Sequence, residues 1–154
     1  MIGTLDPDQI DQVLQMQVYG RIACQLNNRI YIVPVSYCYD GKHLYAHSRR
    51  GLKIDMLRKD PNVCFQVDMV DSLANWRSVI LWGTYEELTT PKGKANAKKI
   101  IDSRFGPLYT SQSISRTSEN IHPPQSVEKR MEAIYFRIKI HEKTGRFERP
   151  NDNK

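Results

Sequence analysis

The residues best placed to do chemistry lie in one short segment, residues 47–53. Arg49, Arg50 and Lys53 crowd the first turn of a predicted helix, and Ser48 directly precedes them. A helix N-terminus already carries about half a positive charge, so cations are unfavourable there unless an anion binds. Free backbone N–H groups, a hydroxyl, a lysine and one or two arginines together form a phosphate pocket. The segment therefore predicts a phosphate-binding turn.

A basic, solvated turn is the alternative explanation of the same residues. The spacing is not that of a Walker loop, nor that of the three-glycine dinucleotide fingerprint. His47 is the histidine that lies beside the turn, and its imidazole can hydrogen-bond a ligand near neutral pH. Successive side chains of a strand point to opposite faces, so His47 and Ser48 are expected to diverge. The neighbouring cations are expected to lower the pKa of His47.

Other reactive side chains show no spacing that indicates a site. Cys24, Cys38 and Cys64 lie in predicted strands, and neither a metal site nor a disulfide is expected from them. Free cysteines agree with a reducing cytoplasm, which is the expected location. A Ser/His/Asp arrangement typical of hydrolases is not recognisable.

Length and composition set broad limits. The 154 residues contain 40% hydrophobic and 26% charged residues, as in an ordinary globular domain with its own core. We expect no membrane partner, because no apolar run approaches the roughly 18–20 residues that span a bilayer. The net charge of +6 arises mainly in residues 92–154, where it is spread as on a solvated face. We expect no nucleic-acid partner, although a nucleic-acid-binding barrel stays open as an alternative.

The elements that must position the turn are predicted as strands with helices at the corners. Helices are expected from Pro7 onward, with Asp6 as N-cap and Gly20 ending the helix or the turn after it, and over 51–60 and 91–104. Alternating or continuous apolar runs predict six strands, over 21–26, 30–39, 43–48, 63–69, 76–88 and 133–141. Short hairpin links between them indicate a mostly β fold with peripheral helices, a small antiparallel barrel.

Some segments carry more specific expectations. The run 30–39 is apolar on both faces, so both faces should be covered, and Pro34 requires a free edge or a break in the strand. Gly83 predicts a bulge. Residues 105–130 have no predicted element, and the tail from about 142 is expected to be disordered. The whole chain, 1–154, is expected to form a single domain.

Taken together, these motifs resemble the FMN-binding split-barrel proteins related to pyridoxamine 5′-phosphate oxidase. Within that family the resemblance is closest to the nitroimidazole-resistance branch. It rests on the order and spacing of Pro34-Val-Ser-Tyr, Asp40-Gly, Leu44-Tyr-Ala-His-Ser, Gly51-Leu-Lys, the run 57–65 and the run 76–83. The resemblance implies a split β-barrel that forms a homodimer with FMN at the subunit interface.

The resemblance also implies roles for individual residues. Lys53 matches the phosphate-binding lysine, with Ser48, Arg49 and Arg50 beside it, and His47 matches a position that lines the ribityl chain and ring. Three residues match the strand that runs along the flavin ring, and two match a strand pair that touches it; these are Val33, Pro34, Val35, Ser78 and Val79. Residues 109–115 match a segment that reaches the flavin of the partner subunit.

The expected function is that of an FMN-dependent oxidoreductase. It would reduce a small organic acceptor such as a nitro compound, with electrons from a nicotinamide nucleotide and with His47 as the catalytic residue. Vitamin B6 oxidation is not expected, because the chain end GRFERPNDNK lacks the tryptophan of the biosynthetic oxidase. The alternative is a non-catalytic flavin- or haem-binding module, in which a histidine would be the axial ligand of the haem.

Overall fold

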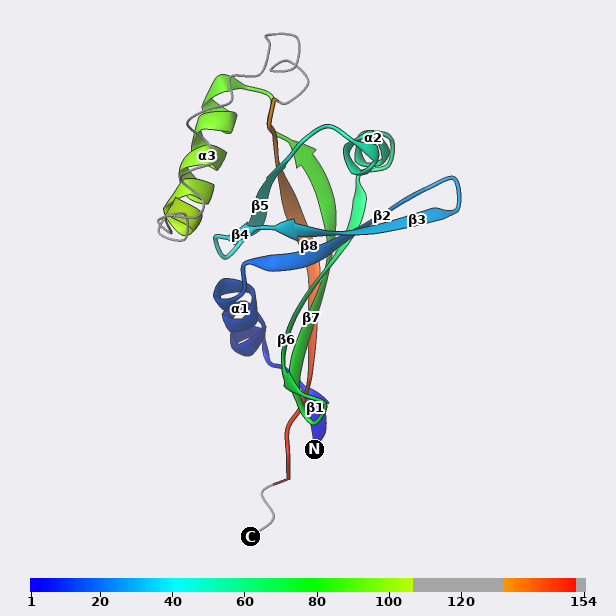
Figure 1. Cartoon of the computed structure of the whole chain (residues 1–154), viewed down its shortest axis with the longest axis vertical. Helices are drawn as coiled ribbons and strands as arrows, with labels where there is room; N and C mark the ends of the chain where they lie inside the picture. Colours follow the sequence, from blue (N-terminus) through cyan, green and yellow to red (C-terminus); the bar gives the residue numbers. More distant parts are fainter. Residues whose placement is uncertain (107–131, 152–154) are drawn as a thin grey trace, which may run out of the picture.

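A computed structural model describes residues 1–106 and 132–151 of the chain. These residues form eight strands and three helices (Figure 1). In chain order they are β1 (Ile2–Thr4), α1 (Pro7–Met16), β2 (Tyr19–Leu26), β3 (Arg29–Ser36), β4 (Cys38–Tyr39), β5 (His43–Ser48), α2 (Leu52–Lys59), β6 (Asn62–Ser72), β7 (Asn75–Glu87), α3 (Pro91–Phe105) and β8 (Ile134–Glu148).

All strand pairs are antiparallel, and the sheet runs in the order β3-β2-β6-β7-β8-β5-β4, with β1 added to β8. The two ends of this path, β3 and β4, are parts of one segment separated only by Tyr37. The sheet must therefore curl until its ends meet. This arrangement confirms the predicted small antiparallel split barrel.

The helices cover different faces of the barrel. α1 and α2 contribute Ile10, Leu14, Ile54 and Leu57 to the main core. α3 packs on the outside of β5, where a second buried cluster forms from Tyr45, Ala97, Ile101 and Phe105. Figure 1 shows α2 and α3 near one end of the barrel and β1 near the other. The strand β5 therefore lies between the main core and α3, and the predicted turn follows directly from it.

Several local predictions agree with the structure. Asp6 caps α1 through a reciprocal pair of hydrogen bonds with Gln9. Pro34 lies on β3, an edge strand, where its missing N–H leaves no ladder bond unmade. The register of β7 against β8 shifts at Gly83, as expected for a bulge. A side chain at Gly83 would collide with the backbone oxygen of Lys139.

Other predictions were wrong, mostly where long-range pairing decides. The last strand does not end at 141, and the expected tail from about 142 is ordered as far as Glu148, because Glu142–Glu148 pair with Trp76–Trp82 of β7. The predicted strand 30–39 breaks at Tyr37, whose hydroxyl donates a 2.7 Å hydrogen bond to the carbonyl of Leu14.

Two further expectations concern the segment 105–130 and a membrane partner. Most of the segment 105–130, including 109–115, lies outside the described residues. None of the helices in the described residues is long and apolar enough to span a membrane.

Candidate functional site

The turn between β5 and α2 has free backbone donors. Gly51 is the N-cap of α2, and it offers no side-chain acceptor to the first N–H groups of the helix. Helices leave these groups without an internal partner. The hydroxyl of Ser48 donates to the carbonyl oxygen of Arg49 at 2.9 Å, so it does not cap the helix either. Several N–H groups at the start of α2 are thus available to an anion.

Lys53 lies in the first turn of α2 and is half-buried. Among the described residues it has neither a hydrogen bond nor an ion pair. Burial lowers the pKa of Lys53, and only the thiol of Cys24 acts in the opposite direction. Burial of an unpaired cation is costly. An anion at the start of α2 would relieve this cost, so Lys53 and the free N–H groups fit a phosphate.

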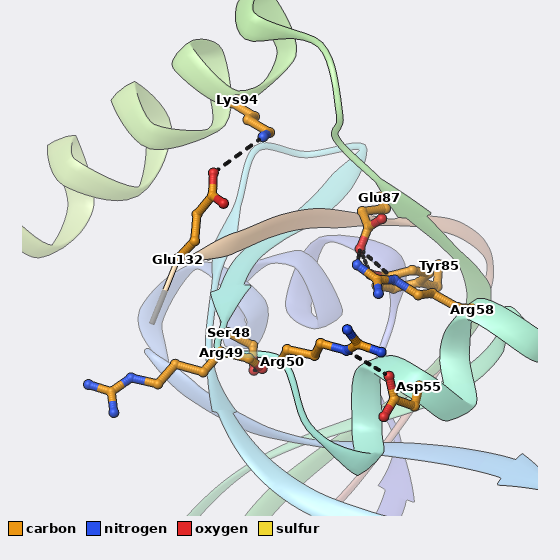
Figure 2. Close-up of polar contacts among 9 residues, drawn as sticks. All are labelled: Ser48, Arg49, Arg50, Asp55, Arg58, Tyr85, Glu87, Lys94 and Glu132. Carbon is orange, nitrogen blue, oxygen red and sulfur yellow. Dashed lines mark hydrogen bonds and ion pairs between the residues drawn. The ribbon is translucent and has the colours of Figure 1, made fainter. Parts of the chain in front are cut away.

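The two arginines of the turn point in different directions. Figure 2 shows Arg50 extending toward Arg58, whereas Arg49 points the other way. The guanidinium Nε of Arg50 lies 3.4 Å from Oδ1 of Asp55, a long ion pair between exposed side chains. Arg49 is exposed and has no ion pair among the residues that the structure describes. Either arginine can therefore turn to a bound anion at little cost.

His47 lies on the face of β5 that is turned toward α3. Leu44 and Ala46 point into the main core, whereas Tyr45 belongs to the cluster beneath α3, so the expected divergence of His47 and Ser48 is confirmed. The ring of His47 lies 5.7 Å from that of Tyr135.

The pKa of His47 is lowered, as expected, but mainly because the imidazole is partly buried. The cation of Lys53 lowers this pKa further, and the carboxylate of Asp102 raises it. The lowered pKa favours the neutral form of the imidazole. It can donate or accept a hydrogen bond beside the turn.

The flavin-ring residues implied by the resemblance fall into two groups. Val35 and Val79 point into the barrel core and are 6% and 0% exposed, so only their backbone is available to a ligand. Val33 is half-buried and packs against the same core. Pro34 and Ser78 lie on the outer face of the sheet. The structure brings the turn residues 47–53 together, and it places Pro34 and Ser78 on a separate surface.

That outer face is apolar, as the sequence predicts, but it is open. Ile32 of β3, Ala23 of β2, Cys64 of β6 and Trp82 of β7 form a row across four strands. Ile32 is 60% exposed and Trp82 is 41% exposed, and a cavity of about 400 Å³ opens beside the row. The expectation that both faces of 30–39 are covered is therefore wrong for the single chain. Only the inner face is covered.

Sequence reasoning missed a charged pocket beside the turn. Its volume is about 580 Å³, and it is lined by Arg50, Arg58, Glu87, Leu88, Thr89, Lys94, Glu132, Ala133, Ile134 and Tyr135. We call it the Arg58 pocket. Arg58 lies in α2, near its C-terminal end. Apart from Arg50 in the turn, the other residues come from the end of β7 and the link that follows it, from α3, and from the start of β8 and the two residues before it. No local motif joins such distant segments.

Comparisons with known proteins agree with this fold. Residues 6–147 match the model of the family described as pyridoxamine 5′-phosphate oxidase. A protein of Rhizobium meliloti (strain 1021), described as uncharacterised, is 30% identical over 132 residues, which are 82% of each chain. These findings confirm the family resemblance.

Two solved structures are similar over nearly the whole chain. A FAD-binding protein from Mesorhizobium loti is 31% identical and has a TM-score of 0.75, with 96% of this chain and 98% of that chain covered. A putative 5-nitroimidazole antibiotic resistance protein from Bacteroides thetaiotaomicron is 19% identical, with a TM-score of 0.66 and coverage of 96% and 89%. The second similarity concerns the fold alone.

Proposed function

Because this chain belongs to the pyridoxamine 5′-phosphate oxidase family, a flavin-binding family, we propose that it holds the phosphate of FMN at the turn between β5 and α2. The observation that carries the proposal is Lys53, a half-buried cation that has no acceptor in the described part of the chain and lies in the first turn of a helix without a side-chain cap. Lys53, the free N–H groups and either Arg49 or Arg50 bind the phosphate. FMN is the smallest flavin that offers both a phosphate and a redox ring.

The flavin ring lies against the backbone of Val33–Val35 in this proposal, with Ser78 and Val79 on the neighbouring surface. A second copy of the chain completes the site as a homodimer. The support is the open apolar row that includes Ile32 and Trp82, because exposed apolar patches commonly mark interfaces. A symmetric pair that buries the same face on each subunit is the commonest solution.

The dimer can be tested with one substitution and a matched control. Ile32→Asp places a carboxylate in the apolar row and is expected to give a monomer with weakened flavin binding. Leu73→Asp is the control, because Leu73 is 95% exposed in the turn between β6 and β7 and lies outside the row. Light scattering at micromolar concentration measures the mass. A monomeric wild-type chain that still binds flavin would contradict the dimer.

We further propose an oxidoreductase that reduces a small organic acceptor such as a nitro compound, with a nicotinamide nucleotide as electron donor. Bound FMN supplies the redox chemistry, and the protein binds and orients the reactants. His47 is the protein group that contacts the acceptor. Its imidazole, whose lowered pKa favours the neutral form, donates a hydrogen bond to an oxygen of the acceptor.

Two measurements test the cofactor and the reaction separately. Titration of the flavin-free chain with FMN and riboflavin is expected to show tighter binding of FMN, because riboflavin has no phosphate for Lys53. Equal affinities would remove the turn from the proposal. Anaerobic oxidation of a nicotinamide nucleotide with a nitroaromatic acceptor tests the reaction. Flavin binding without turnover would leave a flavin carrier.

A further inference from the structure

The Arg58 pocket takes no part in the flavin and acceptor contacts proposed above. We propose that it binds the phosphorylated adenosine end of the electron donor, so that the chain uses a nicotinamide dinucleotide with a 2′-phosphate in preference to one without it. This inference rests on the proposed function, because a donor is needed only if the chain is an oxidoreductase. It names which donor that reaction uses.

Arg58 supplies the pocket with a guanidinium that is held in a fixed position. Its Nε and Nη2 donate to Oε1 of Glu87 at 3.1 and 2.8 Å, and the hydroxyl of Tyr85 donates to the same oxygen at 3.1 Å (Figure 2). Nη1 of Arg58 has no partner among the residues that the structure describes. An arginine held from one side in this way can present its remaining N–H groups to an anion.

Two further cations line the pocket, and both are only loosely engaged. Nζ of Lys94 lies 3.9 Å from Oε1 of Glu132, and Nε of Arg50 lies 3.4 Å from Oδ1 of Asp55 (Figure 2). Exposed ion pairs of this length contribute little to stability. An entering anion can therefore recruit Lys94 and Arg50 without breaking a strong interaction. The pocket combines one preorganised cation with two that can close on an anion.

The number of cations favours a phosphate monoester over a single carboxylate. Near pH 7 such a phosphate carries a charge of about −1.5 to −2 and has three acceptor oxygens, so it can engage Arg58, Lys94 and Arg50 at once. Of the two carboxylates in the lining, Glu87 is already paired with Arg58, and the exposed Glu132 can turn into solvent. Arginine is also the residue that accommodates the 2′-phosphate in other dinucleotide sites.

The rest of the lining suits an adenosine. Apolar surface and one aromatic ring adjoin the cations, supplied by Leu88, Ala133, Ile134 and Tyr135. A base can stack on such a surface, and Thr89 adds a hydroxyl for the ribose or the base. The volume of about 580 Å³ lies in the usual range for pockets that bind small molecules. Phosphate and nucleoside can therefore be bound side by side.

The position of the pocket favours the donor over the small acceptor. Arg50 belongs to the turn and also lines the pocket, whereas Pro34 and Ser78 of the proposed ring surface lie elsewhere. A nicotinamide dinucleotide carries its reactive ring and its adenosine at opposite ends, separated by a pyrophosphate and both riboses. Its adenosine can therefore lie in the pocket while the nicotinamide reaches the flavin ring. A small acceptor does not have this length.

The first test measures binding and does not depend on turnover. Calorimetric titration of the full-length chain, with and without FMN, compares adenosine 2′,5′-bisphosphate with 5′-AMP, which lacks the 2′-phosphate. The bisphosphate is expected to bind at least about tenfold more tightly. Lys94→Glu is expected to reduce this preference to about twofold or less, because a cation of the pocket becomes an anion. Lys99→Glu, the same charge change at an exposed position of α3 outside the pocket lining, is expected to keep it.

The second test measures the preference in turnover. The donor loses a hydride, which together with one proton from solvent reduces the nitro group to a nitroso group and releases water. In wild type, kcat/KM is expected to be at least about tenfold higher for the dinucleotide with the 2′-phosphate than for the one without it. In Lys94→Glu this ratio should fall to about twofold or less, and in Lys99→Glu it should stay as in wild type.

The outcomes separate this inference from the proposed function. If both dinucleotides are oxidised equally well, or the bisphosphate binds no more tightly than 5′-AMP, the pocket assignment is overturned and the oxidoreductase stands. If the bisphosphate is preferred but neither dinucleotide is oxidised, the proposed reaction fails and the pocket assignment stands. If Lys94→Glu keeps the preference and instead raises KM only for a nitroaromatic carboxylate, the pocket binds the acceptor and the inference is wrong.

Discussion

Two partly buried lysines of this protein have opposite surroundings. Nζ of Lys143 donates to Oδ1 of Asp11 at 2.6 Å and to the hydroxyl of Tyr39 at 3.1 Å. Burial alone would lower the pKa of Lys143, but these partners raise it. Lys53 is also half-buried, and burial lowers its pKa because the described residues provide no carboxylate for it.

The difference indicates what each lysine does. Lys143 joins α1, β4 and β8 through partners that belong to the same chain, so its charge stabilises the fold. Lys53 keeps a charge that the fold does not neutralise, beside free N–H groups of α2. Such a group costs stability in the free protein and is useful only when a ligand arrives. The predictions below test this contrast.

The largest expected effect is on flavin binding by Lys53→Ala. Loss of one charge-assisted contact should cost about 1.5–3 kcal/mol, or roughly 10- to 150-fold in the Kd of FMN. Riboflavin affinity should stay the same, because riboflavin lacks the phosphate. Lys143→Ala, at the other lysine, should leave both affinities unchanged. Fluorescence titration measures them, and an equal loss of FMN and riboflavin would make Lys53 a structural residue.

For stability, the two lysines are expected to rank in the opposite order, with the larger loss at Lys143. Lys143→Met should lower the free energy of unfolding by about 1–2 kcal/mol, because Asp11 and Tyr39 lose a partly exposed charged partner. Lys53→Met should leave the free energy of unfolding unchanged or raise it, because an unpaired buried cation is removed. Urea unfolding of the flavin-free chain compares the two variants. A larger loss at Lys53 would reverse the contrast.

Low pH provides a second test of the contacts that Lys143 makes with Asp11 and Tyr39. Burial alone would raise the pKa of Asp11, but hydrogen bonds from Lys143 and Tyr39 lower it overall. The pKa of Asp11 in the folded protein thus lies below its unfolded value of about 3.9. The ionised Asp11 therefore contributes its full stabilisation above about pH 4, and this contribution is lost as the pH falls through the folded pKa. Wild type and Lys143→Met should therefore converge in stability below about pH 4.

A smaller change is expected at His47, beside the unpaired lysine. His47→Ala should keep FMN affinity within about threefold, a change below roughly 0.7 kcal/mol, because the ring does not face the phosphate. Turnover with a nitroaromatic acceptor should fall by at least about tenfold. Flavin titration and anaerobic nicotinamide nucleotide oxidation measure the two effects. Unchanged turnover would remove His47 from the reaction.

The smallest effect sharpens the comparison without any ligand. Because the cation of Lys53 contributes to the lowered pKa of His47, Lys53→Ala should raise that pKa. Lys143→Ala should not change it. Titration of the imidazole by NMR measures the pKa in both variants. An unchanged pKa in Lys53→Ala would mean that the lysine ammonium lies away from the imidazole.

Local sequence determined much of this protein because the relevant interactions are local. The N-cap at Asp6, the alternation of the strand 43–48 and the basic start of α2 each depend on residues close together in the chain. The alternating runs also sufficed to predict the antiparallel barrel. For the same reason the candidate phosphate turn could be predicted without coordinates, because its lysine, arginines, serine and backbone donors lie close together in the chain.

Only the tertiary structure decided what surrounds the turn. The strand beyond residue 141 forms because β7 pairs with it, and its own sequence is too polar to predict a strand. The Arg58 pocket gathers residues from α2, β7, α3 and β8. The partner of Lys143, Asp11, lies on α1, while Lys53 has no such neighbour among the described residues. Burial and pairing depend on contacts between distant segments, and these decide which lysine supports the fold and which is left for a ligand.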